Sequence, residues 1–430
     1  MDLATEPKKI ILENGVTILL DRVPHSYSAS CIICLRSGSR DESEALSGVT
    51  HLAEHLLFKR TLRKSPFDIA VAIDDFGGEV NAFTDPESLC LVGRVSGSRT
   101  EELISFFAEL LFDGAFNAAD LVVEKEIIRQ EIVESLDDPG ESAYQEFSQR
   151  FWGRSALGQP VFGTLASVEA LSPETIRTHL AALTCGTNLV IAVAGCFAEE
   201  SLISKLEQLF GALPAGQRAV RVAPAIGSGA GLIARPVQQS FITLGVQWPH
   251  FADPRYLAGA VVSTVLGDGS SSRLFQILRE KHGLAYDVQS SIDSYSDVGA
   301  LVITATVDAP QLNLALSLML DELERLRDDG VTHDEFRRAV NSLVAQLEMD
   351  TDSISSRMWR LIETELNLGS YVQTQEWIAR LKSLTLNDCL QVTADFLSQG
   401  ELALGVAGKV DGLDLVERVE QFGAARRLTH

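Results

Sequence analysis

Apolar runs separated by turn residues divide the first half of the chain into short strands and amphipathic helices. KKIIL and VTILLDRV flank Asn14-Gly15, a dipeptide typical of tight turns, and predict a hairpin near the N-terminus. The apolar strand SCIICLRSG, an acidic loop and a helix containing HLAEH follow. A helical period is present in ISFFAELLFDGAF and in residues 117–136, whereas TNLVIAVAGCF has the pattern of a buried strand. Strands joined partly by hairpins and partly by helices predict an α+β fold of mixed sheets packed with helices.

The second half of the chain repeats this order of elements. SFITLGVQWPHFADPRYLAGAVVSTVLGDG follows the strand, loop and helix order of SCIICLRSGSRDESEALSGVTHLAEHLLF, at an offset of 210 residues that sets Val261 opposite His51. Further on, GVTHDEFRRAVNSLVAQLEM resembles AFNAADLVVEKEIIRQEIVE, with Gln346 opposite Glu131. We therefore predict two homologous domains, of which only the first keeps polar residues at the critical helix positions.

A stretch rich in Gly, Ala and Pro lies between the two repeats. Residues 213–232, LPAGQRAVRVAPAIGSGAGL, have little periodicity and are the best linker candidate in the chain. The predicted organisation is therefore an N-terminal domain over 1–212, a linker over 213–232 and a related C-terminal domain over 233–430.

Composition excludes several classes of function. The chain has 430 residues, and its 46% hydrophobic and 22% charged residues are ordinary for a globular protein. The net charge of −23 argues against nucleic-acid binding through phosphates. An acidic surface attracts basic peptides, although solubility alone is also a sufficient reason for it.

Nothing in the sequence predicts a membrane segment or a targeting segment. No apolar run reaches the ~18 residues expected of a membrane helix. MDLATEPKKIILENG has neither a continuous apolar signal core nor the arginines of a transit peptide, so we expect a cytoplasmic protein.

The cysteines are predicted to be reduced. Cys31 and Cys34 are close in sequence, but their odd separation on a strand sends the side chains to opposite faces, so they cannot share a metal ion. The other four are scattered, and we expect all six to be thiols, mostly buried: Cys31, Cys34, Cys90, Cys185, Cys196 and Cys389.

The strongest chemical signal is HLAEH. His51 and His55 share a helix face one turn apart, and burying both beside Glu54 costs free energy unless something pairs with them. A catalytic zinc site needs a third protein ligand, and EKEIIRQEIVE offers carboxylates on one helix. Glu124 and Glu131 are seven residues apart, on one face of that helix. Taken alone, the two glutamates also fit a solvent-exposed face of an amphipathic helix.

HLAEHLLFKRT resembles the inverted zinc motif H-x-x-E-H of the pitrilysin, insulin-degrading enzyme and mitochondrial processing peptidase family. The resemblance implies one zinc ion per chain, held by His51, His55 and Glu131, which lies 76 residues beyond the second histidine. It further implies that Glu54 is the general base for a zinc-activated water and that Glu124 supports a ligand imidazole.

The resemblance extends through RSGSRDE, GGEVNAFT and SSRLFQILREKHGLAY, and so covers nearly the whole chain. It implies that Asn81 and Ala82 lie on an edge strand that pairs with extended peptide substrate. It also implies that Arg279 and Tyr286 reach the active site, hold the substrate and help to stabilise the tetrahedral intermediate. From the residues alone, a plain buried strand and an arginine on a solvated helix face remain alternatives.

Three positions depart from the family pattern. Arg60 replaces the glycine of the usual F-K-G-T, and Ala53 and Leu57 replace commoner larger or Met-like residues. None of them is a predicted metal ligand, so they put packing or substrate preference in doubt and leave the catalytic set intact.

The family reading implies a short-chain zinc endopeptidase that cleaves peptides or unfolded segments. Zinc ligands and the Arg–Tyr pair stand in one chain, and the glycine-rich loop of a noncatalytic partner subunit is absent from the sequence. This favours a homodimer whose four domains close like a clamshell around a chamber. Two alternatives remain open: the catalytic half of a heterodimeric peptidase, and a non-catalytic peptide-binding or scaffold relative.

Overall fold

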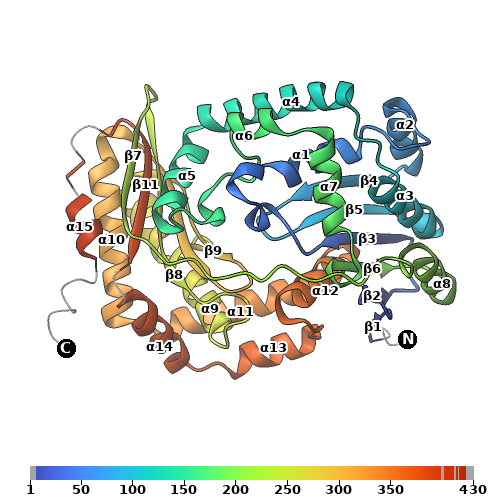
Figure 1. The fold of residues 1–430 in the computed structure, drawn as a ribbon. Helices are drawn as coiled ribbons and strands as arrows, with labels where there is room; N and C mark the ends of the chain where they lie inside the picture. Colours follow the sequence, from blue (N-terminus) through green and yellow to red (C-terminus); the bar gives the residue numbers. More distant parts are fainter. Residues whose placement is uncertain (1–5, 399–400, 411–412, 415, 423–430) are drawn as a thin grey trace. The chain divides into compact units, whose positions relative to one another are not determined.

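The first of two compact units in the computed structural model is built on a six-stranded sheet (Figure 1). The structure describes residues 6–398, 401–410, 413–414 and 416–422. The strand order is β1-β2-β6-β3-β5-β4, and only β2 and β6 pair in parallel among these strands. The strands are β1 (Lys8–Ile11), β2 (Thr17–Arg22), β3 (Ser28–Leu35), β4 (Glu79–Thr84), β5 (Leu89–Ser96) and β6 (Leu189–Gly195).

The predicted N-terminal hairpin is confirmed. β1 pairs antiparallel with β2, with Ile11 opposite Thr17, and Gly15 in the turn has φ +94°. This left-handed conformation suits glycine, and a Cβ there would also lie 2.9 Å from the Thr187 side chain. The Asn14 amide donates to the carbonyl of Phe210 at 2.8 Å, so the turn is fixed to the end of a distant helix.

Helices cover both faces of the first sheet. One face carries an apolar core that includes Leu52, Phe107 and Ile128, and the other packs against Met358 and Leu361 of α12. Burial of both faces explains why the central strands are continuously apolar. The helices of this unit are α1 (Val49–Leu57), α2 (Pro66–Phe76), α3 (Thr100–Phe112), α4 (Ala118–Asp137, whose last turn belongs to the second unit), α6 (Leu165–Ala170), α7 (Pro173–Leu183), α8 (Glu199–Phe210) and α12 (Ile354–Leu368).

The second unit repeats the topology with one strand fewer. Its order is β7-β11-β8-β10-β9, and the strands are β7 (Gly229–Ala234), β8 (Gln239–Trp248), β9 (Ala285–Ser294), β10 (Gly299–Asp308) and β11 (Leu402–Gly408). Its helices are α5 (Pro139–Phe151), α9 (Tyr256–Gly267), a π-helix (Phe275–Lys281), α10 (Leu312–Asp329), α11 (His333–Asp350), α13 (Thr374–Ser383), α14 (Leu386–Leu397) and α15 (Val416–Gln421). Among the described residues, no helix is long and apolar enough to span a bilayer. The prediction of two homologous α+β domains of mixed sheets and helices is confirmed.

The compact units are not contiguous in sequence. α5 comes from the first half of the chain but packs on β7, β8 and β11, whereas α12 comes from the second half and packs on β2, β3 and β6 (Figure 1). The predicted division into 1–212, 213–232 and 233–430 takes each half of the chain as one continuous domain, so it differs from these units. The change of unit at Arg221 and Val222 does fall within the predicted linker, where residues 213–228 form no regular structure.

The prediction that all six cysteines are reduced is wrong for one pair. Cys34 on β3 and Cys90 on β5 are register partners and form a disulfide, with 4.2 Å between the Cα atoms. They are 56 residues apart, so only the strand pairing brings them together. Cys31 points into the opposite core from Cys34, as the odd spacing predicted, and it is a free thiol.

A buried carboxylate ties α12 to the first sheet, and its removal should destabilise the protein. Glu365, with its side chain 3% exposed, pairs with Arg36 at 2.9 Å and with Lys9 at 2.6 Å. Glu365→Ala leaves the Arg36 guanidinium buried without this partner, so we expect a loss of about 3 kcal/mol in the free energy of unfolding by urea. Glu174→Ala, at an exposed ion pair, is the control and should change it by less than ~1 kcal/mol. Equal effects of the two substitutions would contradict this role of α12.

A second ion pair should make stability depend on acid pH. Burial works against ionisation of Glu335, but the bonds from Arg273 and Thr332 prevail and lower its pKa from 4.5 to about 2. Because the folded pKa is lowered, the stabilisation is complete above pH 4.5 and is lost as pH falls through 2. Glu335→Gln should therefore cost about 2 kcal/mol at neutral pH, and this deficit should shrink steadily below pH ~4 in urea unfolding. Asp334→Asn, at an exposed pair on the same helix, should show no such pH-dependent deficit.

Candidate metal centre

The helix that carries the HLAEH motif begins at a tightly enclosed glycine. Gly48 precedes α1 with φ +88°, and a Cβ there would lie 2.5 Å from the Phe162 carbonyl oxygen. The first turn is capped from outside the helix, because the backbone N–H groups of Gly48 and Thr50 each donate to the Glu42 carboxylate at 2.7 Å. A carboxylate at this end also interacts favourably with the helix dipole. Burial raises the pKa of Glu42 to about 7, although the bonds from Thr50 and Gly48 oppose this shift.

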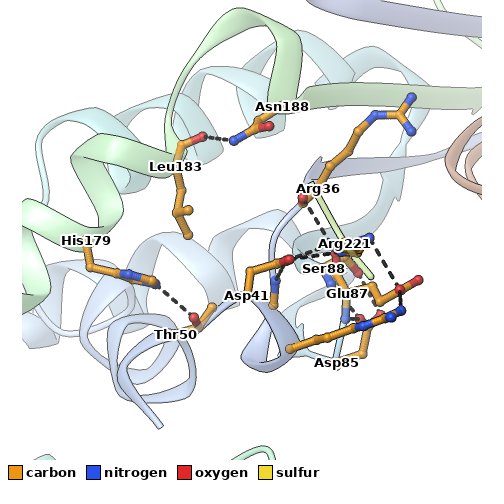
Figure 2. A network of polar contacts seen from close by, with 12 residues as sticks. Arg36, Asp41, Thr50, Asp85, Glu87, Ser88, His179, Leu183, Asn188 and Arg221 are labelled. Carbon is orange, nitrogen blue, oxygen red and sulfur yellow. Dashed lines mark hydrogen bonds and ion pairs between the residues drawn. The ribbon is translucent and has the colours of Figure 1, made fainter. Parts of the chain in front are cut away.

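Two further contacts fix the start of α1 and the acidic loop before it. The Thr50 hydroxyl lies 2.9 Å from Nε2 of His179 on α7 (Figure 2). In the same view Arg221 reaches the loop and donates to both Asp41 oxygens, at 2.9 and 2.7 Å. It also donates to the Glu87 carbonyl at 2.8 Å. The register of α1 is thus fixed by residues from three other segments of the chain.

The two predicted histidine ligands meet Glu131 of α4. Nε2 of His51 lies 3.9 Å from Glu131 Oε2, and Nε2 of His55 lies 3.6 Å from Glu131 Oε1. One donor atom from each of the three residues can be chosen so that all lie within 4.8 Å of one another. The two imidazole rings are 4.7 Å apart, as expected for one turn of a helix.

The donor set fits zinc. Ligands 2.0–2.1 Å from a tetrahedral zinc ion lie about 3.4 Å from one another, close to the spacings of these side chains. Burial, with the neighbouring His55, lowers the pKa of His51 to about 4, so its imidazole is neutral at pH 7 and keeps a lone pair. Nδ1 of His51 is buried without a hydrogen-bond partner among the described residues, whereas Nε2 faces Glu131. Two imidazole nitrogens and one carboxylate are a catalytic zinc set.

Glu124 lies behind His55 and is seven residues, or two helical turns, before Glu131 on α4. Its Oε2 is 3.1 Å from Nδ1 of His55, and its Oε1 is 2.9 Å from Nζ of Lys59. Burial works to raise the pKa of Glu124, but the bonds to His55 and Lys59 prevail and hold it below its ordinary value. Burial likewise works to lower the pKa of His55, but Glu124 and Glu131 raise it above the ordinary value. A carboxylate on the second nitrogen of a ligand histidine fixes the tautomer and the direction of the first.

Glu54 stands beside the donor cluster and outside it. Its Oε2 accepts a hydrogen bond of 2.6 Å from the Thr84 hydroxyl at the end of β4. Burial raises the pKa of Glu54, and the bond from Thr84 opposes this shift. The site therefore holds a carboxylate of raised proton affinity next to three metal donors.

The departures from the family pattern have structural partners. Arg60 donates from Nε to Asp120 at 2.9 Å and so ties the chain after α1 to the start of α4. Ala53 and Leu57 are fully buried against the sheet. These three residues support the packing of α1 and do not enter the donor cluster.

Asn81 and Ala82 lie on β4, which is an edge of the first sheet. β4 pairs with β5 on one side, and no other described strand pairs with it. The Asn81 side chain is exposed, and Ala82 is buried on the face that carries α1. The strand thus offers backbone groups beside the residues of α1.

Arg279 and Tyr286 belong to the second unit and contact each other there. The Arg279 guanidinium donates to the Tyr286 carbonyl at 3.1 Å and lies 4.9 Å from the centre of its ring. The Tyr286 side chain is 79% exposed. The structure brings these two residues together as a pair, and their part in catalysis remains a prediction.

The matching positions of the second unit are apolar. Val261 and Val265 of α9, which stand opposite His51 and His55 in the repeat, lie in the apolar core. The same helix in the same topology therefore packs in one copy and presents metal donors in the other.

Sequence comparison with protein families matches most of the chain. Residues 17–165 match the family model described as "Insulinase (Peptidase family M16)", and residues 170–343 match "Peptidase M16 inactive domain". A Streptomyces coelicolor protein named "uncharacterized zinc protease" is 35% identical over 405 residues, covering 91% of this chain and 87% of the relative. The chain belongs to the M16 peptidase family.

Other M16 relatives agree with this assignment. A Mycobacterium tuberculosis protein, also named "uncharacterized zinc protease", is 33% identical and covers 94% of each chain. A crystal structure titled as a peptidase M16 inactive domain from Pseudomonas fluorescens superposes with a TM-score of 0.88, covering 94% of this chain and 98% of that one. At 20% identity that likeness establishes the fold alone.

Several residues of the site were not found from the sequence. The start of α1 is positioned by Glu42 and His179, the Glu124 carboxylate by Lys59, and the Glu54 carboxylate by Thr84. Each of these four residues either acts on a distant segment or lies in an ordinary local pattern. Glu42 in RSGSRDE, ahead of the helix, is the one that capping logic could have indicated.

Glu124 should strengthen metal binding without being a ligand. In Glu124→Gln a neutral amide replaces the carboxylate on His55, so we expect zinc affinity to fall about tenfold in titration against a chromophoric chelator. Glu134→Gln, an exposed change on the same helix, is the matched control and should stay within about twofold. Unchanged affinity in Glu124→Gln would show that the contact with His55 does not support the site.

Proposed function

We propose that this protein is a zinc-dependent endopeptidase that hydrolyses peptides or unfolded segments. The observation that carries the proposal is the meeting of His51, His55 and Glu131, with Glu54 beside them and outside the donor set. Family membership and the relatives named zinc proteases support both the metal and the reaction. One set of three protein donors corresponds to one zinc ion per chain.

The chemistry of the metal complements that of Glu54. Zinc held by His51, His55 and Glu131 would supply Lewis acidity, which would polarise a peptide carbonyl and make water a stronger acid. Glu54 acts as the general base, takes a proton from the attacking water and delivers it to the leaving amine. Thr84 holds the Glu54 carboxylate in one orientation for both transfers.

The remaining residues of α4 and β4 orient ligand and substrate. Glu124 accepts a hydrogen bond from Nδ1 of His55, which leaves Nε2 free to bind metal. Asn81 and Ala82 lie on an edge strand, and its unpaired backbone groups suit an extended peptide added as a further strand. A peptide bound in this way runs next to Thr84 and Glu54.

The second unit contributes Arg279 and Tyr286 in this proposal. A guanidinium and a phenol hydroxyl are both donors, and they suit the oxygen of a tetrahedral intermediate and the substrate backbone. Their mutual contact limits the conformational freedom of Arg279 before substrate binds.

The proposed assembly is a homodimer in which four domains enclose a chamber, in the cytoplasm. A chamber admits peptides and unfolded segments and excludes folded proteins. The net charge of −23 favours basic substrates. The match of residues 170–343 to an inactive-domain model keeps one alternative in view, namely a chain that needs a partner subunit for activity.

Two substitutions should separate metal binding from proton transfer. Glu131→Gln removes a ligand, so we expect zinc content to fall well below one per chain and cleavage of a quenched fluorescent peptide to be lost. Glu54→Gln should keep the zinc and lose activity by about 10³-fold, because only the base is removed.

Zinc is measured by elemental analysis on the same preparations that are assayed, and Glu134→Gln should match the wild type in both. A wild type that holds zinc without cleaving peptides would support the partner-dependent alternative. Failure to take up zinc at all would contradict the assignment of the ligands.

A further inference from the structure

A pocket of about 300 Å³ opens on the face of the first sheet that is covered by α12. Its floor includes the disulfide between Cys34 and Cys90. Its apolar walls are Phe83 of β4 and Trp359, with Ile362 and Leu366, of α12. All of these residues belong to the first unit.

The two aromatic walls contact each other and are only partly buried. The rings of Phe83 and Trp359 are 5.5 Å apart, and Trp359 is 40% exposed. A large aromatic ring left this open next to an apolar wall can still cover a further apolar group.

An acidic residue also lines this pocket. Glu363 lines the pocket and is exposed, and its carboxylate is in no hydrogen bond or ion pair among the described residues. Burial raises the pKa of its carboxyl group, and the charge of Arg360 opposes this shift. Asp85 also lines the pocket, but its oxygens already accept bonds from Glu87 and Ser88. The pocket therefore combines apolar walls with one carboxylate that can accept a cation.

The pocket follows one cross-strand row of the sheet toward its edge. Cys34 of β3 is opposite Cys90 of β5, and Cys90 is opposite Phe83 of β4. All three residues line the pocket. A strand added at the edge of β4 would set its own residue opposite Phe83, about 5 Å further along this row and on the same face.

The same strand addition relates the pocket to the catalytic carboxylate. Thr84 follows Phe83, points to the other face of the sheet and donates to Glu54. Because side chains alternate along a strand, the peptide residue beside the pocket is next in sequence to the one on the Glu54 side. A side chain of such a peptide would therefore lie at the pocket, one residue from the Glu54 side.

We infer that this pocket is a substrate subsite for a lysine or arginine side chain. Its apolar stem packs between Phe83 and Trp359, and its cationic end meets the Glu363 carboxylate. The inference rests on the proposed peptidase function, and it names Trp359 and Glu363, from the second half of the sequence, as specificity residues of the catalytic unit.

The test measures binding separately from cleavage. Zinc-loaded Glu54→Gln protein is titrated into fluorescent alanine-serine peptides that carry one central lysine, norleucine or glutamate, and anisotropy gives the affinities. The lysine peptide should bind about fivefold more tightly than the norleucine peptide, because the two side chains share the apolar stem and differ in the charge. Glutamate should bind most weakly. Cleavage of the same peptides by the wild type is followed by mass spectrometry.

Two further substitutions, made in the Glu54→Gln background, divide the roles within the pocket. Glu363→Gln should abolish the preference for lysine over norleucine, while Glu200→Gln, an exposed change on α8, should leave the fivefold ratio intact. Trp359→Ala should weaken the binding of the lysine and norleucine peptides alike, by about fivefold, because it removes apolar contact and not charge.

Each outcome decides between the two proposals. Equal binding of lysine and norleucine, no binding of either, or a preference that survives Glu363→Gln would overturn the subsite. Cleavage by the wild type without any preference for lysine would keep the peptidase and overturn the subsite. Selective binding that depends on Glu363, without cleavage by the wild type, would keep the subsite and overturn the peptidase.

Discussion

The contact between α1 and α4 buries a carboxylate, and the rest of the site depends on how that carboxylate is compensated. Glu124 is almost fully inaccessible, so its charge requires donors within hydrogen-bond reach. His55 of α1 contacts one carboxylate oxygen, and Lys59, just after α1, forms an ion pair with the other. Satisfying Glu124 in this way orients the imidazole of His55 toward Glu131. The geometry of the candidate metal centre is therefore a consequence of packing two helices around one buried charge.

The duplicated fold separates what the scaffold needs from what the chemistry needs. Each unit has an ion pair from the chain after one helix to a later helix. Arg60, after α1, pairs with Asp120 of α4, and Arg273, after α9, pairs with Glu335 of α11. The scaffold thus keeps an electrostatic tie in both copies. At the helix position of His51 the second copy has a buried valine, which packs well and binds nothing. The same fold accommodates either a histidine or a valine at this helix position, so the residues of the site and not the fold determine the function.

The exchange of helices gives the second half of the sequence a place in the first unit. α12 covers the sheet face opposite α1, and the buried Glu365 ties it to Arg36 and Lys9. The same helix presents Trp359 and Glu363 beside the edge strand β4. One helix therefore stabilises the sheet with one face and borders the proposed peptide path with another.

Local patterns in the sequence determined the hairpin at Asn14-Gly15, the two mixed-sheet domains and the placement of His51, Glu54 and His55 on one helix. These features depend on neighbours within a few residues, where period and turn chemistry are decisive. The third predicted ligand, Glu131, came from the family resemblance, because its distance along the chain carries no local signal.

Only the tertiary structure decided which distant residues meet. It paired Thr84 with Glu54 and Cys34 with Cys90, and it assigned α5 and α12 to sheets distant in sequence. An apolar helix stripe is satisfied by any complementary sheet face, so the sequence does not specify which sheet the helix covers. Register between strands and the packing of helices fix those choices, because they bring into contact residues that the chain separates by tens to hundreds of positions.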